Sequence, residues 1–115
     1  MYRKFLLAKI HRAIITEANL NYEGSISICP DLLQASGIKV FEQVEIYNIT
    51  NGERFSTYVL AGKLGQICLN GAAAHKGKPG DKIIIACYGY LPQNEINLFN
   101  PKIVLVDGKN KIIKK

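Results

Sequence analysis

Polar side chains interrupt the apolar runs of this sequence in three clusters. They lie at residues 9–12, 22–25 and 53–58, and an Asn-Gly-Ala-Ala-Ala-His segment follows at residues 70–75. The clusters offer a nucleophilic hydroxyl, cations that can pair with an anion, and small residues beside which a ligand can approach the backbone. Each cluster therefore has a chemical interpretation and a plainer structural one.

Arg54 is suited to binding a carboxylate, because a guanidinium pairs with a carboxylate through two parallel hydrogen bonds. It lies close in sequence to Thr57 and Tyr58. The alternative is an ordinary surface arginine in a hairpin. The small side chains at residues 70–73 would let backbone N–H groups contact a ligand, although a tight turn would use the same residues.

Ser25 together with a histidine suggests hydrolysis, but the surrounding sequence argues against it. No Gly-x-Ser-x-Gly elbow contains Ser25, and no acid is placed to complete a triad with His11 or His75. His11 lies inside an apolar run and shares one strand face with Lys9. A polar strip facing solvent explains that pattern as well as a site does.

Short apolar runs separated by turn signals predict a mainly β fold. We expect a central strand at residues 82–90, a half-buried strand at 22–28, and further strands at 5–16, 44–50, 55–61, 66–69, 103–106 and 111–113. Asn51-Gly52 and Asp107-Gly108 predict two hairpins, because these residues tolerate positive φ.

Helix is expected only in short pieces. Pro30 suits the first helical position and Gly37 suits a left-handed stop, which predicts a helix between them. At most one further turn is expected at residues 72–75. The whole pattern predicts a single domain, residues 1–115, forming a small closed or nearly closed β-barrel with one or two short helices.

Composition excludes several classes of protein. The 115 residues are 48% hydrophobic and 21% charged, which is an ordinary globular composition. No run approaches the roughly 18 apolar residues of a membrane span, and no secretory signal precedes the first strand. The three cysteines form neither a CxxC nor a Cys/His cluster, so neither a disulfide framework nor a metal site is expected. These features predict a cytoplasmic protein.

The net charge of +6 comes from lysines and arginines near the two ends of the chain. Nucleic-acid binding usually requires basic side chains clustered on a folded face and interleaved with aromatic ones. We therefore expect neither a nucleic acid nor a membrane as a partner, and interpret the basic ends as solvated segments.

Four segments together resemble the signature blocks of pyruvoyl-dependent aspartate 1-decarboxylase, in the order of that family. They are Lys-Ile-His-Arg at 9–12, Asn-Tyr-Glu-Gly-Ser at 21–25, Thr-Asn-Gly-Glu-Arg-Phe-Ser-Thr-Tyr at 50–58 and Asn-Gly-Ala-Ala-Ala-His at 70–75. The resemblance runs from about residue 3 to residue 107. Cys29 departs from it, because the family often has an acidic or capping residue before the helix. The lysine-rich end matches nothing in the family pattern.

The resemblance implies a double-psi β-barrel that forms a homotetramer and cuts its own chain between Gly24 and Ser25. The products would be residues 1–24 (the β chain) and 25–115 (the α chain), with Ser25 converted into a pyruvoyl group. Thr57 would hold the Gly24 carbonyl, and His11 would assist proton movement. Neither a metal nor pyridoxal phosphate is implied, and the need for an accessory maturation protein stays open.

The resemblance also implies the reaction, which is α-decarboxylation of L-aspartate to β-alanine for pantothenate and coenzyme A biosynthesis. The pyruvoyl ketone would form a Schiff base with the substrate amine and accept the electrons. Tyr58 would return a proton, and Arg54 would bind a substrate carboxylate with Lys9 adding charge. The remaining substrate contacts are assigned to Thr57, Asn70, Gly71, Ala72 and Ala73.

The alternative is a non-catalytic double-psi β-barrel binding module, because such barrels also occur in nucleic-acid-binding and chaperone-type proteins. A binding module has no reason to keep Gly24-Ser25, Arg54, Tyr58 and Asn70 together. Thr57 and Tyr58 are strand neighbours and should point to opposite faces. They can reach one centre only near the end of the strand or at a boundary between subunits.

Overall fold

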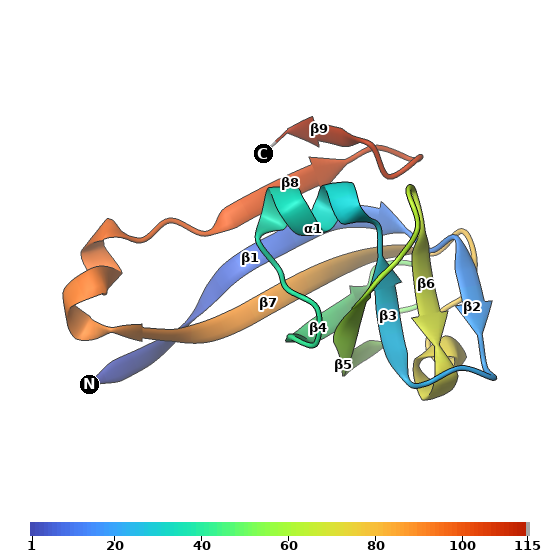
Figure 1. Ribbon diagram of the computed structural model, residues 1–115, viewed down its shortest axis with the longest axis horizontal. Helices are drawn as coiled ribbons and strands as arrows, with labels where there is room; N and C mark the ends of the chain where they lie inside the picture. The colour runs from blue at the N-terminus through green and yellow to red at the C-terminus, as the bar shows by residue number, and fades with distance from the viewer. Residues whose placement is uncertain (115) are drawn as a thin grey trace.

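Nine β-strands form one mixed sheet in residues 1–114, the part of the chain that this computed structural model describes (Figure 1). Their order across the sheet is β2-β6-β3-β5-β4-β7-β1-β8-β9. The strands are β1 (Tyr2–Ile14), β2 (Glu17–Asn19), β3 (Ser25–Ile28), β4 (Gln43–Asn48), β5 (Arg54–Ala61), β6 (Ile67–Asn70), β7 (Lys82–Pro92), β8 (Lys102–Val106) and β9 (Ile112–Lys114).

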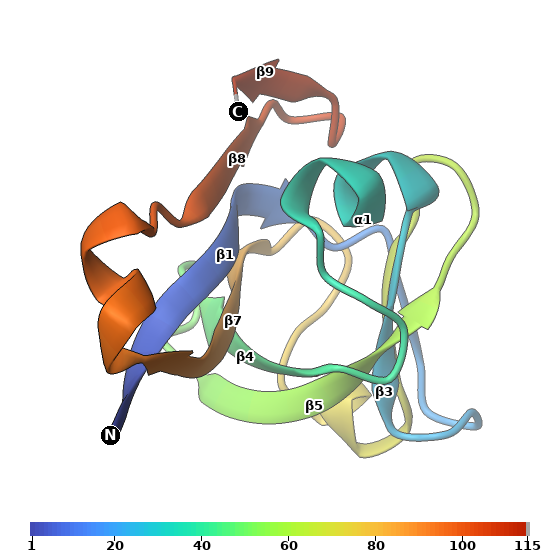
Figure 2. The same cartoon turned by 60° about the vertical axis from the view of Figure 1, so that its left-hand side comes forward.

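The sheet curls into a small barrel-like arrangement. In Figure 2, the ribbons of β1, β7, β4, β5 and β3 curve around a common interior, and α1 (Pro30–Ser36) lies across one end. The interior is filled by fully buried aliphatic side chains, which include Ile10, Ile46, Val59 and Ile85. The prediction of a mainly β fold with little helix is confirmed.

The predicted helix is present with the expected ends. Pro30 opens α1, and Gly37 closes it with a φ of 76° while its N–H donates to the Leu33 carbonyl at 2.9 Å. Cys29 precedes the helix and makes no side-chain capping bond. The single turn expected at 72–75 is a 3-10 helix, η1 (Gly71–His75), and a second one, η2 (Gln93–Leu98), was not expected.

Both predicted hairpins form. Gly52 takes a φ of 80° in the turn between β4 and β5, and β8 pairs antiparallel with β9. In the second hairpin the left-handed residue is Asn110, at a φ of 60°, and not Gly108. The Asn110 side chain accepts a hydrogen bond from the Ile14 N–H at 2.7 Å and donates to the Ile14 carbonyl at 2.9 Å, so it ties this turn to β1.

Two strand predictions need correction. The strand expected at 22–28 begins only at Ser25, and β3 is buried on both sides and not on one. It lies between β5 and β6, and its polar side is covered as well as its apolar side. The sequence also gave no sign of β2, whose three exposed residues are held by parallel pairing with β6. The strand expected to be central, β7, does pair on both edges, with β1 and β4.

Candidate active site

The sheet places most of the candidate site residues on its side facing away from the apolar core. Directly paired residues on neighbouring strands point to the same side of a sheet. Ser25 pairs with Asn70, and Tyr47 pairs with both Arg54 and Ile84. On that side we distinguish a serine cluster, formed by Ser25, Ser27, Tyr58, Cys68 and Asn70, and a basic cluster, formed by Lys9, His11, Tyr47 and Arg54.

The serine cluster is buried except for the half-buried Tyr58, and hydrogen bonds link its serine, cysteine and asparagine side chains. Ser25 is 0% exposed and Asn70 is 3% exposed. The Asn70 amide nitrogen donates to the Ser25 hydroxyl at 2.9 Å and to the Ser27 hydroxyl at 3.0 Å. The Ser25 hydroxyl in turn donates to the Glu23 carbonyl at 3.0 Å. One donor and one acceptor therefore fix the orientation of the candidate nucleophile.

Gly71 allows the segment after Asn70 to lie directly against the loop before Ser25. Its φ is 61°, and a Cβ at this position would lie 2.6 Å from the Gly24 nitrogen and from the Tyr22 carbonyl oxygen. Only glycine fits such a backbone approach. The Ala72 N–H lies beside Gly24 as well, whereas the Ala73 side chain packs into the core.

Tyr58 lies next to this loop and is held in its protonated form. Its hydroxyl donates to a Glu23 carboxylate oxygen at 3.4 Å. Desolvation, followed by the negative charge of Glu23, raises the pKa of Tyr58 above its ordinary value. A tyrosine that keeps its proton at neutral pH can serve as a proton donor.

Thr57 lies on the other side of β5, as strand alternation predicts. Val44, its partner on β4, and Val59, two residues along β5, are both core residues. The side-chain hydrogen bonds found in residues 1–114 do not include one between Thr57 and Gly24. The parallel pairing of Ile26 with Val59, extended by two residues, brings Thr57 level with Gly24.

The basic cluster is built around an aromatic ring that the sequence analysis did not single out. The Arg54 guanidinium carbon lies 4.0 Å from the centroid of the Tyr47 ring, which is a cation–π contact. The Tyr47 and Tyr88 hydroxyls are 2.9 Å apart. Burial and this hydroxyl pair raise the pKa of Tyr47 to about 12. Tyr47 could have been found from the sequence, because the register of the Asn51-Gly52 hairpin sets it opposite Arg54.

The cations of this cluster have few partners in their own chain. In residues 1–114 the one ion pair joins Lys76 to Glu53, so no carboxylate of the described chain pairs with Arg54. Burial, and then the charges of Lys9 and Arg12, lower the pKa of His11. The His11 Nδ1 atom is buried without a hydrogen-bond partner in the described chain. The cluster is thus positively charged and open to an anion.

A single chain does not bring the two clusters together. Arg54 precedes Tyr58 by four residues on one strand, which is about 13 Å at 3.3 Å per residue. Lys9 and His11 lie on β1, three strands from β5 in the sheet, which is about 14 Å. Within one chain the two clusters thus lie apart, and the assignment of Lys9, Arg54 and Ser25 to one site stays a prediction.

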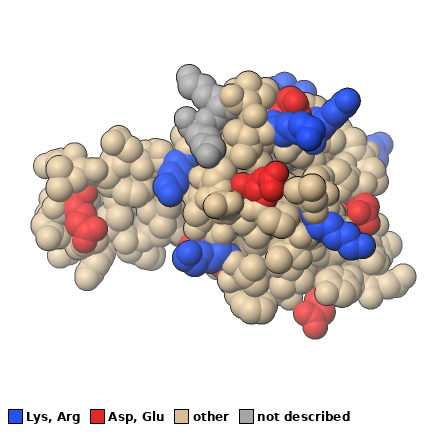
Figure 3. Space-filling model, turned by 45° about the horizontal axis from the view of Figure 1, so that its top comes forward, with Lys and Arg blue, Asp and Glu red and all other residues tan. Residues whose placement is uncertain are grey.

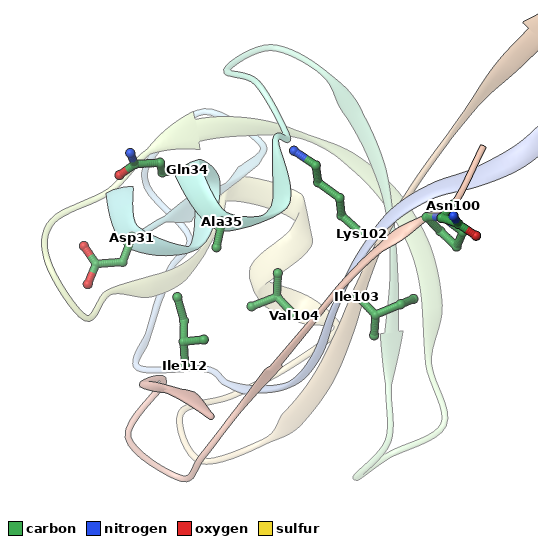
Figure 4. A pocket seen from close by; sticks show the side chains of 9 residues that line it. Asp31, Gln34, Ala35, Asn100, Lys102, Ile103, Val104 and Ile112 are labelled. Atoms are coloured by element: carbon green, nitrogen blue, oxygen red, sulfur yellow. The ribbon is translucent and has the colours of Figure 1, made fainter. Parts of the chain in front are cut away.

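Another hollow in the surface of the described residues lies away from both clusters. A groove of about 800 Å³ lies between α1 and β8, and its lining side chains include Asp31, Lys102, Val104 and Ile112 (Figure 4). Basic and acidic side chains are interspersed on the face shown in Figure 3. All three cysteines are free, and the described residues hold no group of three metal-ligating side chains. No helix in residues 1–114 is long and apolar enough to cross a membrane.

Comparison with known proteins identifies the class to which this barrel and its buried serine belong. The family model described as aspartate decarboxylase matches residues 1–113. The chain therefore belongs to the aspartate decarboxylase family, and it is an enzyme of the decarboxylase class. The resemblance seen in the four sequence blocks is confirmed.

Individual relatives are similar in sequence to this chain over nearly its full length. It is 58% identical to the aspartate 1-decarboxylase of Hydrogenobaculum sp., covering 98% of this chain and 90% of that protein. It is 56% identical to the aspartate 1-decarboxylase of Bdellovibrio bacteriovorus, and the match covers 96% of this chain and 89% of that protein. It is 48% identical to the aspartate 1-decarboxylase of Thioalkalivibrio sulfidiphilus, and the match covers 99% of this chain and 92% of that protein.

Proposed function

We propose that this protein removes the α-carboxylate of L-aspartate to give β-alanine and carbon dioxide, using a pyruvoyl group made from its own Ser25. The observation that carries the proposal is the fully buried Ser25 hydroxyl, held between Asn70 and the Glu23 carbonyl next to Gly24. The names of the relatives support aspartate as substrate. The product would serve pantothenate and coenzyme A biosynthesis in the cytoplasm.

Maturation begins with an acyl shift at the Gly24–Ser25 bond. The Ser25 oxygen bonds to the Gly24 carbonyl carbon, the Gly24–Ser25 C–N bond breaks, and the hydroxyl proton ends on the freed amine. Elimination of the Gly24 carboxylate leaves dehydroalanine, and water converts that residue into the pyruvoyl group and ammonia. Gly24 has no side chain to block the attack, and Thr57 on β5 is assigned to hold its carbonyl.

Each residue of the proposed site has a separate role in decarboxylation. The pyruvoyl group supplies the electron sink for decarboxylation. Arg54 binds a substrate carboxylate through its planar fork, and Lys9 adds positive charge. Tyr58 returns a proton from its hydroxyl to the substrate carbon. Asn70 and the backbone N–H groups of residues 71–73 supply hydrogen bonds.

The separation of the two clusters supports a homotetramer in which each site is shared between chains. The basic cluster of one chain would face the serine cluster of the next, and such head-to-tail contacts can close into a ring. The unpartnered His11 Nδ1 and the absence of a carboxylate beside Arg54 in the described chain support this arrangement.

Intact mass spectrometry of the purified protein tests the proposal. We expect two pieces, of 24 and 91 residues, with the second piece carrying the pyruvoyl mass in place of serine. Ser25→Ala should give only the intact chain and release no carbon dioxide from aspartate. Ser36→Ala, at another buried serine that lies in α1, is the matched control and should mature normally. Cleavage of the Ser25→Ala protein at this bond would refute the mechanism.

A further inference from the structure

Cys68 is a buried thiol that the proposed chemistry leaves without a role. The other two cysteines, Cys29 and Cys87, belong to the apolar core cluster. Cys68 is 4% exposed but lies outside that cluster, on the same side of β6 as Asn70. Its neighbours on this side are therefore polar groups of the serine cluster.

The Cys68 thiol donates a hydrogen bond to the side-chain oxygen of Asn70, with sulfur and oxygen 3.2 Å apart. The Leu69 carbonyl, at 3.8 Å, is the more distant acceptor. Burial, and then the charge of Glu17, raise the pKa of the Cys68 thiol, against a smaller opposing effect of the Asn19 N–H. The thiol consequently keeps its proton at neutral pH and remains a donor.

An asparagine carboxamide has one accepting end and one donating end, so its orientation determines what its neighbours can do. With its oxygen on Cys68, Asn70 presents both N–H donors to the Ser25 and Ser27 hydroxyls. A flipped amide would instead offer its oxygen to Ser25. That oxygen would compete with the Glu23 carbonyl for the Ser25 proton, and the nucleophile would lose its fixed orientation.

We propose that Cys68 is a positioning residue for self-cleavage, because its thiol holds the Asn70 amide in the orientation that donates to Ser25. Cys68 acts through Asn70 and does not itself reach the reacting bond. This inference rests on the proposed function, since it concerns the same serine. It adds that a donor at position 68, and not merely a side chain of suitable volume, sets the rate of maturation.

The experiment compares the first-order rates of self-cleavage in wild type, Cys68→Ala and Cys68→Ser, followed by intact mass after a short induction. We expect Cys68→Ala to slow cleavage about five- to tenfold, as the loss of one buried hydrogen bond would. Cys68→Ser keeps a donor and should stay within about twofold of wild type. Cys87→Ala, at a buried cysteine of the core, is the control and should cleave at the wild-type rate while losing thermal stability.

The relative cleavage rates of the variants decide whether Cys68 is a positioning residue. Wild-type cleavage in Cys68→Ala, or equal slowing in the alanine and serine variants, would show that position 68 contributes only packing. A second measurement, hydrogen exchange of the Asn70 side-chain amide by NMR, is made on chains that have not yet cleaved, because cleavage would remove the Ser25 hydroxyl. We expect slow exchange in wild type and Cys68→Ser and faster exchange in Cys68→Ala, and equal rates in all three would overturn the proposal. A wild-type chain that never cleaves would refute the proposed function, and the exchange rates would still test Cys68.

Discussion

Replacing Gly71 with alanine tests whether the close approach of two backbone segments controls self-cleavage. At this residue φ is 61°, and an added Cβ would lie 2.6 Å from the Gly24 nitrogen, 2.6 Å from the Tyr22 carbonyl oxygen and 2.7 Å from the Gly24 Cα. All three atoms belong to the backbone, so no side chain can rotate away to make room. The segment that carries the proposed cleavage site must move instead.

The size of the effect follows from these distances. Restoring an ordinary contact of 3.4 Å requires a displacement of about 0.8 Å at Gly24. A misplacement of about 1 Å between reacting groups can lower a rate about a hundredfold. We therefore expect self-cleavage of Gly71→Ala to fall about a hundredfold. The left-handed backbone adds a loss of stability of about 1–2 kcal/mol.

Gly52→Ala separates these two contributions. Gly52 has a φ of 80°, and a Cβ there would meet no heavy atom within 4 Å. This variant therefore carries the conformational cost without the collision, and it should cleave at the wild-type rate. The assay is a cleavage time course by intact mass together with thermal melts of both variants. Equal cleavage rates in Gly71→Ala and Gly52→Ala would refute the argument that the backbone contact positions Gly24.

Four further substitutions address the assigned roles and the hairpin at the carboxyl end. Arg54→Lys keeps the charge but loses the planar fork, so the KM for aspartate should rise about tenfold while self-cleavage is retained, and wild-type kinetics would exclude Arg54 from the site. Tyr58→Phe should mature yet lose about 10²–10⁴-fold in decarboxylation, whereas Thr57→Val should slow maturation; a time course and a carbon dioxide assay on each variant test both roles. The pKa of Asp107 is lowered from 3.8 by two backbone N–H groups of its turn, so its charge stabilises the fold above that pH and the benefit is lost as the pH falls through the folded pKa. Asp107→Asn should therefore melt below wild type at neutral pH and approach it in acid, and a constant difference would contradict this.

Local patterns were sufficient to predict most of the fold. The Asn51-Gly52 pair predicted a tight hairpin, because these residues tolerate positive φ. The β-branched run of β7 predicted a central strand, because such side chains pack well between two neighbouring strands. The double burial of β3 was not predictable, because it depends on Ser25 and Asn70 satisfying each other across two strands that are distant in sequence. Alternation of polar and apolar residues normally signals a solvent-facing side, and here the polar side is covered.

Sequence motifs predicted which residues belong to the candidate site, but not how these residues are arranged. The blocks named Ser25, Arg54 and Asn70, but not which side chains contact one another, because these contacts follow from strand register. Cys68 contacts Asn70 since alternate residues of β6 share a side, and Tyr47 stacks on Arg54 since β4 pairs with β5 in that register. The distance between the two clusters likewise became visible only with the order of strands across the sheet.

The distance between the serine and basic clusters has a genetic consequence. If each site takes its serine cluster from one chain and its basic cluster from another, a defect in one cluster leaves the other cluster of the same polypeptide intact. Chains inactivated at Tyr58 and chains inactivated at Arg54, coexpressed and assembled at random, would then rebuild wild-type pairs at about one quarter of their sites. Two null alleles of this gene would complement each other, whereas two alleles damaged in the same cluster would not.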